Sequence, residues 1–164
     1  MIKKIFLITL ILLQFGCGYK IANNSSYYNF QILSFKLTGE KKINNILDKN
    51  FKRFNNNKNS SPVYELTSDS EIIRSITSKN SSGNILTYKS EIIIKLKIFE
   101  NNNLISEISF NEKTDYNNTT SKFELKQYED ILLQDLTNQI IVKINNHLST
   151  LKWFLDHLNL KKLR

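Results

Sequence analysis

Residues 85–99 read ILTYKSEIIIKLKIF, the clearest alternation of apolar and polar side chains in this chain of 164 residues. One face of an extended strand would carry Leu86, Tyr88, Ile92, Ile94, Leu96 and Ile98. The other face would carry Thr87, Lys89, Glu91, Lys95 and Lys97, with Ile93 as the exception. A period of two residues is typical of an antiparallel strand with one buried and one solvated face. The stretch therefore predicts a strand of an antiparallel sheet.

Similar runs lie on both sides of this strand. Residues 63–78 place apolar side chains in one phase at Tyr64, Leu66, Ile72 and Ile76, and Arg74 falls in the same phase. Residues 104–116 do the same with Leu104, Ile108, Phe110 and Tyr116. The polar segments 79–84 (KNSSGN) and 101–103 (NNN) separate the three runs and are typical of tight turns. Together they predict a three-stranded meander.

One more strand and two helices flank the meander. Residues 27–37 (YYNFQILSFKL) favour a strand, and their alternation slips between Ile32 and Leu33, which predicts a bulge. The apolar side chains of residues 43–54 are spaced by three and four, the period of one helix face. Ser121 and Glu124 form a capping box ahead of a helix of roughly thirty residues that ends near Leu151.

The elements follow one another in the order β-α-β-β-β-α. Two helices can cover one face of a four-stranded sheet, so that both layers share one core. We therefore expect an α+β fold, a two-layer sandwich whose four-stranded, mostly antiparallel sheet carries both helices on one face. The chain is long enough for one such domain, at residues 27–151, and not for two.

The N-terminus has the layout of a secretory signal. Lys3 and Lys4 precede eleven uncharged residues, 5–15, and then come Gly16 and Cys17, the only cysteine. A lone thiol at this point is typical of a bacterial lipoprotein, in which residues 1–16 are removed and Cys17 carries the lipid. Residues 17–26 would then form a lipidated tether. The alternative is a plain signal peptide, or an uncleaved anchor, with an incidental cysteine.

The C-terminal residues 152–164 (KWFLDHLNLKKLR) form an amphipathic, basic tail. Such a segment can lie on a membrane surface or dock on a protein partner. Equally, it can be an additional helix that caps the core. The sequence leaves these alternatives open.

Composition argues against several classes of protein. The formal net charge is +8, but lysine, asparagine and isoleucine are all over-used, so the charge is weak support for a nucleic-acid partner, and we expect none. Gly-rich phosphate loops and nucleophile elbows are missing from the sequence. His147 and His157 stand apart from any Cys or carboxylate cluster, which favours helix histidines over metal ligands. We expect no enzyme, no metal site and no cofactor.

The order of parts resembles a known family. Cys17-Gly18-Tyr19 is followed by a strand, a helix, three meandering strands and a long helix. This arrangement resembles the LPS-assembly lipoprotein LptE in its α-proteobacterial form, from Cys17 to about Leu151. The resemblance implies an outer-membrane lipoprotein on the periplasmic side, held in the membrane by its N-terminal lipid. It also implies two partners, the β-barrel LptD, which it plugs and helps to assemble, and lipopolysaccharide, which it binds during export.

Cationic side chains are the candidates for lipopolysaccharide binding, because that ligand carries clustered phosphates beside acyl chains. The candidates are Arg74, Lys79, Lys89, Lys95 and Lys97. The three strand lysines can equally be solvated residues of a wet sheet face. An arginine directed into the core would need a partner there; our hypothesis is that Arg74 instead reaches a phosphate or a carboxylate of the partner. A different lipoprotein adaptor, such as a pilotin-like assembly factor, is the alternative function.

Overall fold

The computed structural model describes residues 30–55 and 60–162. It contains β1 (Gln31–Gly39), α2 (Lys41–Asn55), β2 (Val63–Lys79), β3 (Ile85–Glu100), β4 (Asn103–Asn117) and α3 (Lys122–Lys162). The order β-α-β-β-β-α and the α+β class are confirmed. The signal peptide, Cys17, the tether and the first residues of the predicted 27–37 strand lie outside the described residues.

The four strands form one sheet in the order β1-β2-β3-β4. The meander β2-β3-β4 is antiparallel, whereas β1 pairs with β2 in parallel. A parallel pair needs a crossover connection, and α2 supplies it between β1 and β2. The predicted bulge is confirmed, because the β1–β2 register shifts between Ile32 and Ser34. Leu33 is the extra residue and is turned out to solvent.

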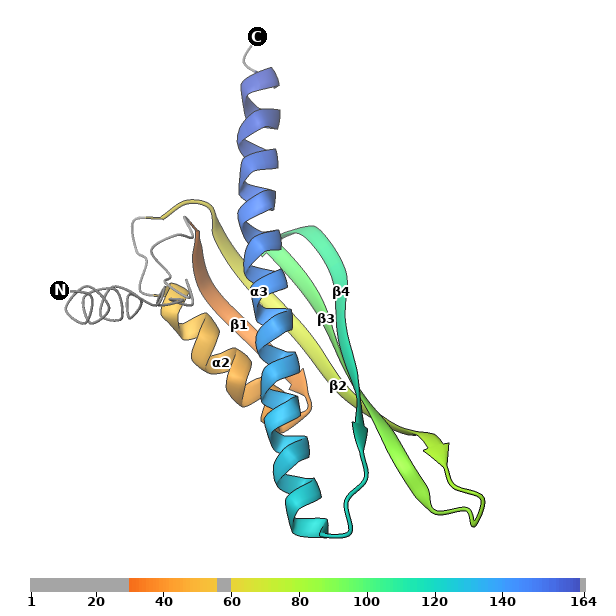
Figure 1. The fold of residues 1–164 in the computed structure, drawn as a ribbon. Helices are drawn as coiled ribbons and strands as arrows, with labels where there is room; N and C mark the ends of the chain where they lie inside the picture. Colours follow the sequence, from red (N-terminus) through yellow and green to blue (C-terminus); the bar gives the residue numbers. More distant parts are fainter. Residues whose placement is uncertain (1–29, 56–59, 163–164) are drawn as a thin grey trace, which may run out of the picture.

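Both helices pack on the same face of the sheet (Figure 1). The sheet contributes Ile32, Tyr64, Leu66, Ile92, Ile94, Leu96, Ile98 and Phe110 to the core, and Phe30, directly before β1, joins them. The helices contribute Ile43, Leu47, Phe51, Phe54, Leu133, Leu136, Ile140, Ile141, Ile144 and Leu148. Each fully buried large side chain of this kind contributes about 1.5–3 kcal/mol of transfer free energy. This shared core is the main stabilising feature of the two-layer sandwich.

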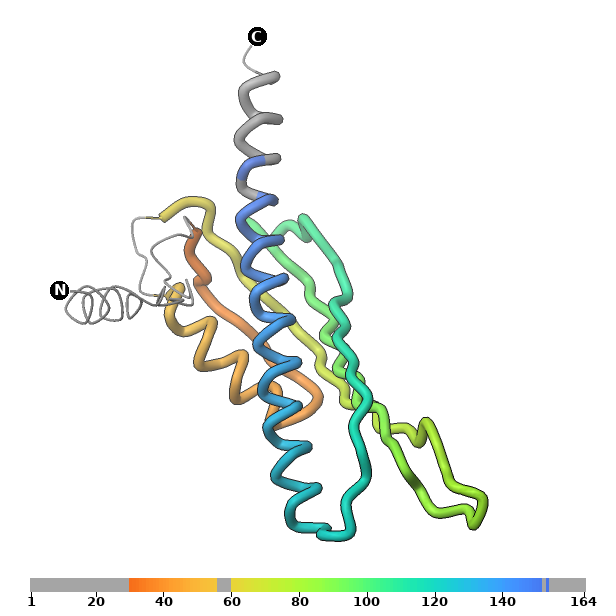
Figure 2. Tube along the Cα trace, viewed as in Figure 1, coloured from red at the N-terminus to blue at the C-terminus, as the bar shows by residue number. Residues whose placement is uncertain are grey.

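The far end of the β2–β3 hairpin diverges from α3 and stands away from the helix layer, as the tube in Figure 2 shows. β2 has 17 residues and β3 has 16, against nine in β1, so the hairpin is about 50 Å long. The expected burial of Ile76 and Leu86 is therefore wrong: each is 48% exposed. They lie on the phase that faces the helices, but no helix of the described chain covers this part of the sheet.

Helix α3 is longer than the sequence indicates. Its 41 residues correspond to about 60 Å. The Ser121 hydroxyl accepts the Glu124 amide N–H at 3.3 Å, as expected for an N-cap. The helix does not end near Leu151 but continues to Lys162, through most of the predicted tail. No helix in the described ranges is both long and apolar enough to cross a bilayer.

Candidate functional site

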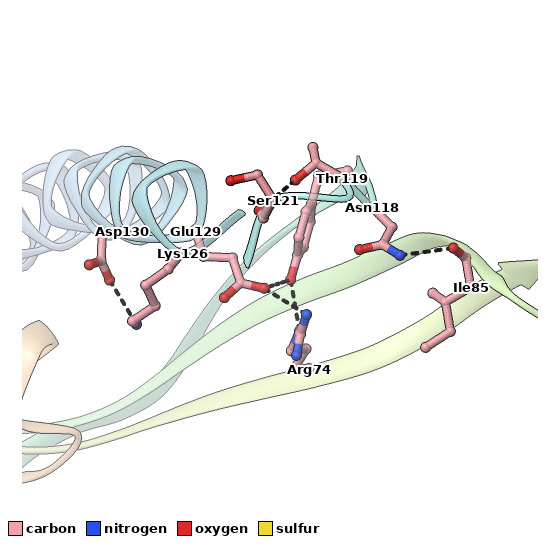
Figure 3. A network of polar contacts seen from close by, with 9 residues as sticks. Arg74, Ile85, Asn118, Thr119, Ser121, Lys126, Glu129 and Asp130 are labelled. Carbon is pink, nitrogen blue, oxygen red and sulfur yellow. Dashed lines mark hydrogen bonds and ion pairs between the residues drawn. The ribbon is translucent and has the colours of Figure 1, made fainter. Parts of the chain in front are cut away.

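Arg74 lies on β2 at the point where the hairpin leaves the helix layer. Its Nε donates to the Tyr116 hydroxyl at 3.0 Å, and its Nη2 lies 2.9 Å from Glu129 Oε1. Its guanidinium also lies over the Tyr88 ring, 3.8 Å from the centroid. Figure 3 shows Arg74 reaching from the sheet toward Glu129 on α3. The partner that an inward arginine needs is thus supplied by the chain itself.

Tyr116, on β4, lies at the centre of this network. Its hydroxyl donates to Glu129 Oε1 at 2.6 Å while it accepts from Arg74. Burial and the hydrogen bond to Glu129 raise the pKa of Tyr116 to about 12. Its ring stacks on Tyr88 at 5.6 Å and contacts Tyr128 at 6.1 Å. The phenol therefore stays neutral at physiological pH and joins β2, β4 and α3.

A second group of charges links the two helices beside this network. Asp130 Oδ1 lies 2.5 Å from Lys42 Nζ on α2 and 3.2 Å from Lys126 Nζ. The hydrogen bond from Lys42 is the main reason that the pKa of Asp130 is lowered. Both groups line one cleft of about 300 Å³, together with Glu40, Ile72, Ser90 and Leu133. We call it the Arg74 cleft.

The Arg74 cleft is electrically balanced. Three cations line it, Lys42, Arg74 and Lys126, against three carboxylates, Glu40, Glu129 and Asp130. In Figure 3 the dashed lines pair Arg74 with Glu129 and Lys126 with Asp130. An anion that bound beside Arg74 would compete with Glu129 for the guanidinium.

The five predicted cations do not form one cluster. Lys89, Lys95 and Lys97 alternate with the buried residues of β3, so they lie on the sheet face away from the helices and from Arg74. On that face Lys89 is opposite Asp115, Lys95 is opposite Asp69, and Lys97 pairs with Glu107 at 3.4 Å. Lys79 ends β2, about 17 Å along the strand from Arg74. A single basic surface built from all five is therefore not present.

Two features of the sequence pointed to the network without identifying it. Tyr88 and Tyr116 share the apolar phases of their strands, and the register places them opposite each other. Glu129 and Asp130 are neighbours on α3 and so cannot face each other. In the structure they point to different elements, Glu129 to Arg74 on β2 and Asp130 to Lys42 on α2.

His147 has a packing role. It is half-buried on α3, with Nε2 3.1 Å from Ser106 Oγ on β4, and its ring contacts Phe110 edge-on. Burial lowers the pKa of His147. Lys143 adds an ion pair to Glu112 at 2.6 Å on the same side. These contacts fix α3 against β4. Among the described residues there is no group of three His, Cys, Asp or Glu that could hold a metal ion.

The sequence matches no protein-family model and no curated protein. The fold, however, is similar to solved structures. One is the rare lipoprotein B from Shewanella oneidensis, at TM-score 0.51 and 12% identity over 78% of this chain and 98% of that one. Another is a minor lipoprotein from Acinetobacter baumannii, at TM-score 0.52 and 16% identity over 73% and 92%.

A third is the uncharacterized lipoprotein B from Nitrosomonas europaea, at TM-score 0.54 and 12% identity over 80% of this chain and 90% of that one. All three are bacterial lipoproteins, and each is covered over nearly its whole length. The identities are low, so the likeness concerns the fold. This chain thus has a fold that solved bacterial lipoproteins share.

Proposed function

We propose that the protein is a non-enzymatic, lipid-anchored outer-membrane lipoprotein of the LptE kind. In this role it plugs the β-barrel LptD, assists its assembly and binds lipopolysaccharide during transport to the cell surface. The observation that carries the proposal is a combination: the only cysteine of the chain ends an apolar leader, and the domain behind it has a fold found in bacterial lipoproteins.

The physical chemistry of the chain agrees with this role. Diacyl and further acyl chains on Cys17 would give stable anchoring, because each buried CH₂ contributes about 0.8 kcal/mol and two chains suffice. Lipopolysaccharide presents phosphates beside acyl chains. Arg74 can exchange Glu129 for a phosphate, and the exposed Ile76 and Leu86 lie further along the same hairpin. Cation and apolar area are therefore adjacent on one face of the hairpin.

The alternative is a lipoprotein adaptor, such as a pilotin-like assembly factor for another outer-membrane complex. The open sheet face favours it, because the lysines there alternate with carboxylates across the strands. A balanced surface of this kind suits a protein partner better than a polyanion. The two functions share the lipid anchor and differ in the partner.

Affinity purification from the native outer membrane tests the proposal. The full-length protein is isolated with a C-terminal tag, and mass spectrometry identifies the co-purified proteins and the mature N-terminal peptide. We expect an acylated Cys17 and a stoichiometric large β-barrel, both lost in the Cys17→Ser variant. An acylated Cys17 with another partner would leave the adaptor, and an unmodified N-terminus without a barrel would exclude both functions.

A further inference from the structure

A second polar groove lies between the two helices, apart from the Arg74 cleft. It has a volume of about 190 Å³, and its walls are Lys49, Asn50 and Arg53 of α2 and Gln134 and Asn138 of α3, with Ile46 and Ile141 beside them. The two helices lie next to each other on the sheet in Figure 1. We call this the helix groove. Its lining differs from that of the Arg74 cleft in charge and in hydrogen-bonding groups.

The helix groove is cationic and contains no carboxylate in its lining. Lys49 and Arg53 are four residues apart, so they lie on one side of α2. Neither forms an ion pair with a carboxylate within residues 30–55 and 60–162, whereas Lys42 and Lys52 of the same helix pair with Asp130 and Asp48. The two free cations make the helix groove a site that attracts anions without first displacing a carboxylate.

Asn50 contributes a carboxamide to the wall of the helix groove, beside Lys49 and Arg53. The residue is only 8% exposed, it lines the helix groove, and its Oδ1 is buried without a hydrogen-bond partner. An unpaired buried acceptor lowers stability, and an apolar side chain of the same shape would pack better there. Asn145 of α3 carries an unpaired Oδ1 as well and does not line the helix groove, so the unpaired oxygen alone does not mark a ligand site. What Asn50 adds to the helix groove is a carboxamide beside two cations.

We infer that the helix groove binds a phosphorylated sugar. Lys49 and Arg53 would hold the phosphate through charge-assisted hydrogen bonds. The carboxamides of Asn50, Gln134 and Asn138 both donate and accept, which is what sugar hydroxyls require. The inference stands on the groove alone and not on the proposed function. The headgroup of lipopolysaccharide and a soluble sugar phosphate offer the same chemistry, and the experiment separates these two sources.

Isothermal titration calorimetry of the full-length protein in detergent micelles tests the inference, with N-acetylglucosamine 1-phosphate as the probe. We expect saturable binding that is weakened tenfold or more in Arg53→Gln and about fivefold in Asn50→Leu. Lys41→Gln, which removes a charge from α2 outside the groove, should bind like the native protein. The absence of saturable binding, or unchanged affinity in Arg53→Gln, would overturn the inference. Equal affinity for inorganic phosphate would overturn the claim that the helix groove recognises the sugar as well as the phosphate.

Thermal unfolding separates a binding role of Asn50 from a structural one. Because its Oδ1 is unpaired, Asn50→Leu should keep or raise the melting temperature while it weakens binding. Asn145→Leu is the matched control, since Asn145 on α3 is buried with an equally unpaired Oδ1 but does not line the helix groove. Its affinity for the probe should be unchanged. A lower melting temperature together with unchanged affinity in Asn50→Leu would contradict the inference.

Competition with lipopolysaccharide identifies the source of the sugar phosphate. Displacement of the probe by lipopolysaccharide in the native protein would point to the lipid headgroup. Probe binding that lipopolysaccharide does not compete with would point to a soluble sugar phosphate. If the protein bound no lipopolysaccharide at all, the proposed function would fail, while the binding of the probe would still support the helix groove.

Discussion

The α-carbon of Gly39, the last residue of β1, lies directly against the main chain of Ser70 on β2. A Cβ at this position would collide with the Ser70 carbonyl oxygen and lie 2.7 Å from the Ser70 nitrogen, and the backbone φ is +90°. Ser70 in turn holds the start of α2, because its hydroxyl and its carbonyl both accept the Glu40 amide N–H, at 3.0 and 2.9 Å. The crossover from sheet to helix therefore depends on this contact.

Substitution Gly39→Ala should destabilise the fold by about 2–4 kcal/mol, since overpacking against the main chain adds to the strain of a positive φ. Urea unfolding followed by circular dichroism measures the loss. Gly83→Ala is the control: its φ is also positive, at +81°, but a Cβ there would meet no atom within 4 Å outside its chain neighbours. It should lose only about 1 kcal/mol. Equal losses in the two variants would contradict the close approach of Gly39 to Ser70.

The Arg74–Glu129 pair should show a modest coupling energy. The two side chains are 45% and 23% exposed, so solvent screens the pair and a double-mutant cycle with Arg74→Gln and Glu129→Gln should give about 0.5–1 kcal/mol. The same Arg74→Gln variant should weaken lipopolysaccharide binding if Arg74 exchanges partners. Arg74→Ala with unchanged ligand affinity and unchanged barrel assembly would remove Arg74 from the proposed function.

Tyr116 should make stability fall at alkaline pH. The pKa of Tyr116 is raised to about 12 from an ordinary value near 10, so the folded chain holds the phenolic proton more tightly than the unfolded chain. The stabilisation is complete below pH 10 and is lost as the pH rises toward 12. The free energy of unfolding of native protein and Tyr116→Phe should therefore converge over this range. A constant difference between them would count against the raised pKa of Tyr116, and so against the effect of its burial and of its hydrogen bond to Glu129.

His147 should make the stability of the fold fall at acidic pH. Burial lowers the pKa of His147, so the folded chain binds this proton less tightly than the unfolded chain does. Stability is then complete above the ordinary histidine pKa of about 6.5 and falls as the pH drops through the lowered value. Melting temperatures of native protein and His147→Gln between pH 4 and 8 check this. The melting temperature of the native protein should fall further on acidification than that of the variant.

Substitutions of Ile76 and of Ile94 should differ sharply in their effect on the free energy of unfolding, although both residues lie on the sheet face that carries the helices. Ile94 is fully buried, and Ile94→Ala should cost about 2–5 kcal/mol. Ile76 lies beyond the helix layer, so Ile76→Ser should change the free energy of unfolding by less than about 0.5 kcal/mol. A large loss from Ile76→Ser would mean that some further part of the chain covers the hairpin.

The local sequence pattern predicts the helices and strands of this fold well, but it does not predict which parts of the sheet the helices cover. The break in alternation after Ile32 predicted the bulge, and Ser121 predicted the start of α3, because both features depend only on residues that are close together in the sequence. The alternation that contains Leu86 identifies its face but not whether a helix reaches it. The partners of Arg74 could not be predicted, since Tyr116 and Glu129 come from distant parts of the chain. Asn50 did carry a signal, as a polar residue on the apolar face of its helix.

The length of the β2–β3 hairpin beyond Arg74 would amplify a small tilt at its base into a larger movement of its tip. Its root is held by the contacts of Arg74 with β4 and α3, and its far end lies about 17 Å or more beyond that point. A tilt of about 10° at the root would move the tip by about 3 Å over such a length. A change of contacts at Arg74 that tilted the hairpin by this amount would thus move the tip by about two thirds of the spacing between neighbouring strands. A small change of contacts in the body of the protein would then appear as a larger displacement at the tip of the hairpin.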